Sequence, residues 1–70
     1  MTIKEAIKIF NNICPNKKVI GYTDYQGFKV VITEFTGDIE SNYYIIVDKE
    51  HVLPTNPIMI NLDDQKVVKL

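Results

Sequence analysis

The sequence contains no arginine, and it has only one cysteine, one histidine and three glycines among its 70 residues. The single cysteine, Cys14, excludes an internal disulfide, which favours a reducing compartment such as the cytoplasm over a secreted setting. So few glycines leave little material for a phosphate-binding loop, and without arginine the chain lacks the best bidentate reader of phosphate groups. The opening segment MTIKEAIKIF carries charges where a signal peptide needs an apolar stretch, and every apolar run is far too short to span a membrane. These absences predict a small cytoplasmic protein.

The charge of the chain is almost balanced, because eight lysines stand against nine acidic residues and the net charge is −1. Nucleic acids and anionic membranes are usually bound through clustered basic residues, so neither is an expected partner. A net charge near zero also gives little repulsion between copies, so self-association is not discouraged. The length predicts one domain that covers residues 1–70.

The pattern at the start of the chain predicts a helix over residues 2–13. Thr2 and Glu5 form a capping box, in which the Thr2 hydroxyl accepts from the Glu5 N–H and the Glu5 carboxylate reaches back to the Thr2 N–H. Apolar residues then recur at helical spacing from Ile3 to Ile13. Pro15 disfavours helical geometry at the residue before it and ends the helix.

After residue 17 the apolar period changes to about two, which is typical of strands. Strands are predicted over residues 18–25, 28–36 and 43–49, with a tight turn at Gly27 and a loop over residues 54–57. In the tail, the alternation over residues 58–62 favours a further hairpin, and a C-terminal helix is the alternative. The predicted fold is α+β, with one N-terminal helix packed on an antiparallel β-meander of four to six strands. The predicted core consists of Ile3, Ile7, Phe10, Ile13, Ile20, Tyr22, Val30, Ile32, Ile45, Val47, Leu62 and Val68.

Gly21 is unexpected inside the first predicted strand. A glycine at such a position marks a β-bulge or the close approach of another backbone. A gap that faces the helix is the alternative interpretation.

Asp48, Glu50 and His51 bring the only histidine of the chain close to two carboxylates. Such a group could bind a divalent metal or act as a general base, and the alternative function is therefore a small metal-binding protein or enzyme. A metal site usually needs three or four ligands from converging elements, whereas the tip of a turn directs its side chains outward. The segment INLDDQKVV (60–68) repeats the pattern of IIVDKEHVL (45–53) with a lysine in place of the histidine. The pattern therefore favours an Asp-led turn, with no metal and no cofactor.

The predicted sheet has more apolar side chains than one short helix can cover. Strict alternation assigns Val31, Phe35, Tyr44 and Ile46 to the second face, and Tyr25 is a further candidate for partner contact. Tyrosine is enriched at protein interfaces, although ordinary cross-strand packing would also explain these residues. The sequence thus predicts a non-enzymatic interaction or adaptor protein that uses an open sheet face or an edge strand, as a homodimer or with a protein partner.

The order AIKIF, then VIGYTDYQGFKVVI, then NYYIIVDKE resembles a loose group of small uncharacterised proteins from Gram-positive bacteria and their prophages. The topology is also similar to helix-plus-sheet modules of the PepSY kind. The resemblance implies a phage- or prophage-encoded origin, and it supplies no catalytic residue. Members of the group usually continue the last turn with Thr-Gly, whereas Glu50-His51 stands here, which puts the match at this turn in doubt.

Overall fold

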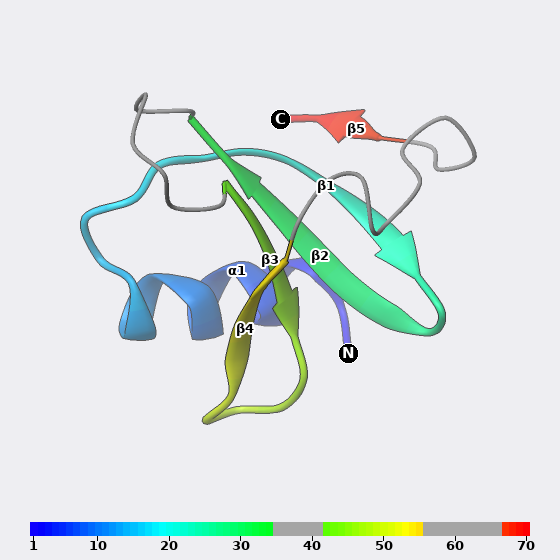
Figure 1. Cartoon of the computed structure of the whole chain (residues 1–70), viewed down its shortest axis with the longest axis horizontal. Helices are drawn as coiled ribbons and strands as arrows, with labels where there is room; N and C mark the ends of the chain where they lie inside the picture. Colours follow the sequence, from blue (N-terminus) through cyan, green and yellow to red (C-terminus); the bar gives the residue numbers. More distant parts are fainter. Residues whose placement is uncertain (35–41, 56–66) are drawn as a thin grey trace.

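The computed structural model describes residues 1–34, 42–55 and 67–70, which form one helix and a five-stranded sheet (Figure 1). The elements are α1 (Ile3–Ile13), β1 (Val19–Tyr25), β2 (Phe28–Thr33), β3 (Tyr43–Ile46), β4 (Val52–Thr55) and β5 (Val68–Lys69). The strand order is β4-β3-β2-β1-β5, and every pairing is antiparallel. The α+β prediction is therefore confirmed, with a four-strand meander to which β5 is added beside β1. No helix in the described ranges is long and apolar enough to cross a membrane.

Helix α1 begins where the capping residues place it. The Thr2 hydroxyl accepts from the Glu5 N–H at 3.2 Å, as expected. The Glu5 carboxylate, however, accepts from the Thr2 hydroxyl at 3.1 Å and not from the Thr2 N–H. At the other end, the Cys14 N–H closes the last turn by donating to the Phe10 carbonyl at 2.7 Å, and Pro15 follows. The predicted helix bounds are thus confirmed to within one residue.

The core lies between α1 and strands β2 and β3. Ala6 and Phe10 from the helix contact Val31, Tyr44 and Ile46 from the sheet, and all five are at most 6% exposed. The rings of Phe10 and Tyr44 pack with their centroids 5.1 Å apart and tilted by 51°, a favourable aromatic geometry. Figure 1 shows α1 lying along one face of the sheet, behind these strands. Full burial of one large apolar side chain, such as that of Phe10, stabilises the fold by about 1.5–3 kcal/mol.

The prediction of which sheet face the helix covers is wrong. Alternation alone assigns Val31, Tyr44 and Ile46 to an open second face, yet they are the residues against α1. Val30 and Ile32 point to the opposite face because side chains alternate along a strand. The reason for the error lies in β2, where the four consecutive residues Val30–Thr33 are all buried. A strand buried on both faces carries no alternation from which the helix side can be inferred.

The predicted core list is partly correct. Phe10, Val30 and Ile32 are buried, and Ile3 and Ile7 pack against the core from partly buried positions. Tyr22 and Ile45 are half-buried, and Leu62 lies outside the described residues. Four predicted core residues are instead more than a third exposed, namely Ile13, Ile20, Val47 and Val68. Each of them lies at the end of an element or, for Ile20, in a bulge, where packing from neighbouring elements is incomplete.

Gly21 lies both beside a β-bulge and close to another backbone, the two features that a glycine inside a strand indicates. The register between β1 and β2 shifts between Val19 and Gly21, which marks a bulge around Ile20. A Cβ atom on Gly21 would lie 2.8 Å from the Val68 carbonyl oxygen of β5. The strand at Val68–Lys69 also excludes a helix at those two residues, whereas the rest of the predicted tail hairpin lies outside the described residues.

Candidate functional site

The β3–β4 turn is organised by the carboxylate of Asp48. One oxygen, Oδ1, accepts from the Glu50 N–H at 2.8 Å, and His51 Nδ1 lies 2.7 and 2.8 Å from the two carboxylate oxygens. The Val47 N–H also donates to the His51 carbonyl at 3.0 Å, which extends the pairing of β3 with β4 into the turn. An aspartate that accepts from a backbone N–H two residues later is the arrangement of an Asx turn. The predicted Asp-led turn is therefore present.

These hydrogen bonds act on the ionisation of Asp48. They lower the pKa of its carboxyl below the ordinary value of 3.8, first through the Glu50 N–H and then through the His51 side chain. Both side chains of the Asp48–His51 pair are more than half exposed, so water screens their attraction. The pair thus holds the shape of the turn at its solvent-facing tip.

The alternative acid/base or metal group is only partly assembled. His51 contacts Asp48, but Glu50 contributes its backbone N–H to the turn. In the described part of the chain, no group of three or more His, Cys, Asp or Glu side chains is placed to hold a metal ion. The contact of Asp48 with Nδ1 orients the imidazole ring, and orientation of this kind serves the turn as well as it would serve catalysis.

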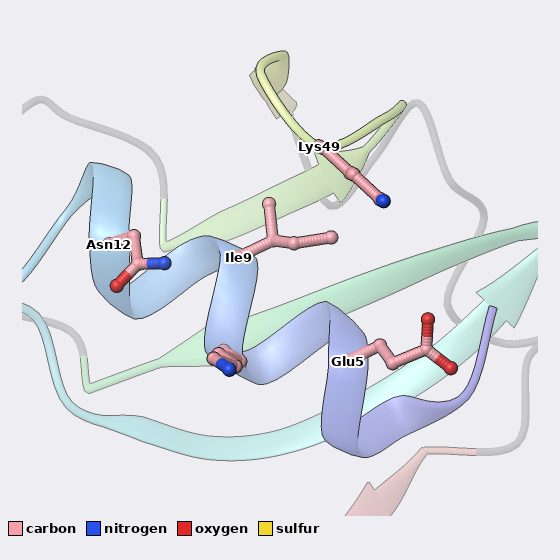
Figure 2. Close-up of a pocket in the computed structure, with 5 residues that line it drawn as sticks. Glu5, Ile9, Asn12 and Lys49 are labelled. Atoms are coloured by element: carbon pink, nitrogen blue, oxygen red, sulfur yellow. The ribbon is translucent and has the colours of Figure 1, made fainter.

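A shallow groove lies between the turn and helix α1 (Figure 2). Its volume is about 270 Å³. Its lining residues are Glu5, Lys8, Ile9 and Asn12 from α1 and Lys49 from the turn. Sequence reasoning missed this groove because Lys49 is distant in sequence from the helix. The one sign of the groove in the sequence was Ile9, an apolar residue outside the row of apolar residues that recur at helical spacing in α1.

The predicted partner-binding residues do not form a common surface. Val31, Tyr44 and Ile46 are buried beneath α1, so the prediction that they lie on an open face is wrong. Tyr25 is half-buried at the end of β1, and Phe35 lies outside the described residues. A helix has to bury an apolar sheet face, and it covers these three side chains.

Three apolar residues are exposed at the turn end of the sheet face opposite the helix, whereas Val30 and Ile32 on the same face are buried. Phe28, Val47 and Leu53 are 43%, 37% and 53% exposed, and we call them the open-face patch. Leu53 is directly opposite Ile45 in the β3–β4 ladder, and Val47 continues the alternation of β3 on the same side. Phe28 precedes Lys29, which pairs with Ile46, so Phe28 and Val47 are cross-strand neighbours. The patch therefore spans three neighbouring strands at the end of the sheet where both turns lie.

Strand β4 leaves one sheet edge without a described neighbour, and Pro54 weakens that edge as a site for pairing. Because the Val47 N–H donates to the His51 carbonyl, these two residues form a hydrogen-bonded pair. Hydrogen-bonded and non-hydrogen-bonded pairs then alternate along the β3–β4 ladder. By that alternation, the backbone groups of Val52 and Pro54 point away from β3. Pro54 has no N–H, so it removes a donor from this edge at no cost to the β3–β4 ladder.

Comparison of the chain with protein-family models, with curated proteins and with solved structures found no match. The resemblance to small proteins of Gram-positive bacteria and their prophages therefore stays a prediction.

Proposed function

We propose that this chain is a non-enzymatic interaction protein that associates through the turn end of the sheet face opposite helix α1, first of all with a second copy of itself. The observation that supports this is the open-face patch, in which Phe28, Val47 and Leu53 expose apolar surface from three adjacent strands. Exposed apolar side chains that gather on one face are typical of interaction sites, whereas scattered ones need no explanation.

Two features favour the face over the edge and a second copy over a charged partner. Pro54 removes a hydrogen-bond donor from the edge of β4 that faces away from β3, which disfavours strand addition there. The net charge of −1 produces little repulsion between copies. The patch itself contains no charged residue, so its contact with an identical patch leaves no unpaired charge.

Size-exclusion chromatography with light scattering tests this proposal over a range of protein concentrations. We expect the measured mass to rise from that of one chain toward that of two as the concentration increases. Leu53→Lys should shift this transition to higher concentration, because it places a charge within the apolar contact. Ile13→Lys is the matched control, since Ile13 is 42% exposed on α1, outside the patch, and it should leave the transition unchanged.

A chain that stays monomeric at every concentration would overturn self-association. An equal effect of Leu53→Lys and Ile13→Lys would overturn the assignment to the open-face patch. Val52→Pro tests the edge separately, because it removes the remaining N–H that points away from β3 in this part of β4. If that variant folds and abolishes association, the edge and not the face carries the contact.

A further inference from the structure

We infer that the groove between α1 and the β3–β4 turn binds a carboxylate that carries a short branched apolar group. This site is separate from the open-face patch and does not rest on the proposed function. Its ligand would be a small free organic acid or the C-terminal end of a peptide with an apolar last residue. The two sources share the same recognised chemistry.

The positive charges of the groove come from two different elements. Lys8 belongs to the helix and Lys49 to the turn, and both line the same hollow. Figure 2 shows Lys49 reaching from the turn toward the side of α1 from which Ile9 projects. Neither ammonium has an ion-pair or hydrogen-bond partner in the described part of the chain, in contrast to Lys18 with Glu34 and Lys29 with Asp24. Two unpaired cations at one hollow favour an anion between them.

The remaining lining residues restrict which anion is suitable. Ile9 is half-buried and provides the apolar part of the surface, on which a branched hydrocarbon group can pack. Asn12 provides an amide that can donate to a second oxygen. Glu5 contributes one negative charge, so two lysines and one glutamate leave a single net positive charge. A monoanion therefore suits the groove better than a doubly charged phosphate.

The size of the groove also limits the ligand. Its volume of about 270 Å³ is below the range of roughly 300–1,000 Å³ that is usual for sites of drug-sized molecules. A ligand of about a dozen heavy atoms in such an open site binds with a Kd on the order of 1 mM. Amide NMR of the labelled full chain measures affinities in this range.

The experiment is a set of NMR titrations with four probes. Isocaproate represents the free acid, and N-acetyl-leucine represents the peptide end. N-acetyl-leucinamide is the neutral control for N-acetyl-leucine, and inorganic phosphate tests charge without an apolar group. We expect isocaproate and N-acetyl-leucine to shift the amide signals of Lys8, Ile9 and Lys49, and the other two probes to shift them at least about three-fold less at the same concentration.

Variants then connect the shifts to the charges. Lys8→Gln and Lys49→Gln should each weaken binding about two- to five-fold, as expected for loss of one exposed ion pair. Lys18→Gln, whose lysine lies outside the groove, should have no effect. Glu5→Gln should strengthen binding, because it removes the competing carboxylate while glutamine preserves the capping box.

Each outcome decides a specific point. Binding of both acids supports the shared chemistry, and binding of one alone supports the site and identifies the source of the ligand. Equal binding of N-acetyl-leucinamide, or an absence of shifts with both acids, would overturn the inference. The inference would also be overturned if phosphate bound as strongly as the two acids, since Ile9 would then have no part in recognition.

Discussion

Gly21 and Val68 approach so closely that a Cβ atom on Gly21 would lie 2.8 Å from the Val68 carbonyl oxygen. Real Cβ atoms do not approach a backbone oxygen to this distance, so any other residue at position 21 has to displace β5 or β1. The Leu70 N–H donates to the Ile20 carbonyl at 3.0 Å beside this contact. The absence of one side chain thus permits β5 to join the sheet.

We therefore predict that Gly21→Ala releases β5. The expected loss is about 1 kcal/mol of unfolding free energy, since the pairing of β5 comprises few hydrogen bonds. Hydrogen exchange should show faster exchange at the Leu70 amide. Gly27→Ala is the control, because Gly27 has a φ of 84° in the β1–β2 turn and a methyl group there would meet no atom within 4 Å. That variant should cost about 1–2 kcal/mol through backbone strain while the Leu70 amide stays protected. Unchanged Leu70 exchange in Gly21→Ala would contradict the prediction.

The second prediction concerns Tyr44, which is buried against Phe10. Tyr44→Ala should lower the free energy of unfolding by about 3–5 kcal/mol, because it removes a large core side chain and leaves a cavity. Tyr44→Phe keeps the ring and should cost less than about 1.5 kcal/mol. Urea denaturation followed by circular dichroism measures both changes. If Tyr44→Ala were as stable as the unmodified chain, Tyr44 would be a surface residue, as the sequence alone indicates.

The error over Tyr44 shows how far the sequence could predict this molecule. The helix was predictable because its caps and apolar spacing are local, and the turn at Gly27 was predictable because a glycine lies between two runs of strand-forming residues. The side of the sheet that the helix covers depends on contacts between distant residues. Since Val30 and Val31 are both apolar and both buried, no local pattern distinguishes the two faces. The bulge at Ile20 further shifts the alternation of β1 relative to β2.

The same reasoning applies to the candidate sites. The Asp48 turn could be predicted because its hydrogen bonds join residues within three positions of one another. The groove joins Lys8 to Lys49, and only the packing of α1 against the sheet brings the two residues to one hollow. The exposure of Leu53 could not be predicted either, because it depends on the position of β4 at the end of the described strand order.

The third prediction concerns the Thr2 cap. Thr2→Ala should destabilise the chain by about 1 kcal/mol, because the Glu5 N–H loses its acceptor at the helix N-terminus. Thr2→Ser is the control, since serine retains the hydroxyl and should lie close to the unmodified chain. The midpoint of urea denaturation measures the difference. Equal midpoints for all three chains would show that the cap contributes nothing to stability.

The last prediction follows from the lowered pKa of Asp48. A carboxyl whose pKa is lower in the folded chain than in the unfolded one favours folding when it is ionised. Its contribution is therefore fully present above the ordinary value of 3.8 and is lost as the pH falls through the lower folded-state pKa. In Asp48→Asn, the free energy of unfolding should therefore fall less steeply as the pH is lowered below 3.8 than it does in the unmodified chain. Carboxyl-carbon NMR should place the pKa of Asp48 below 3.8 in the folded chain.

His51→Ala separates the two causes of that lowered pKa. The Glu50 N–H is the larger cause and remains in this variant, so the pKa of Asp48 should rise only part of the way toward 3.8. A full return to 3.8 would make the imidazole the principal partner and would assign the turn to the Asp48–His51 pair. A pKa that does not change would mean that water screens the exposed imidazole completely, and the contact at 2.7 Å would then have no electrostatic role.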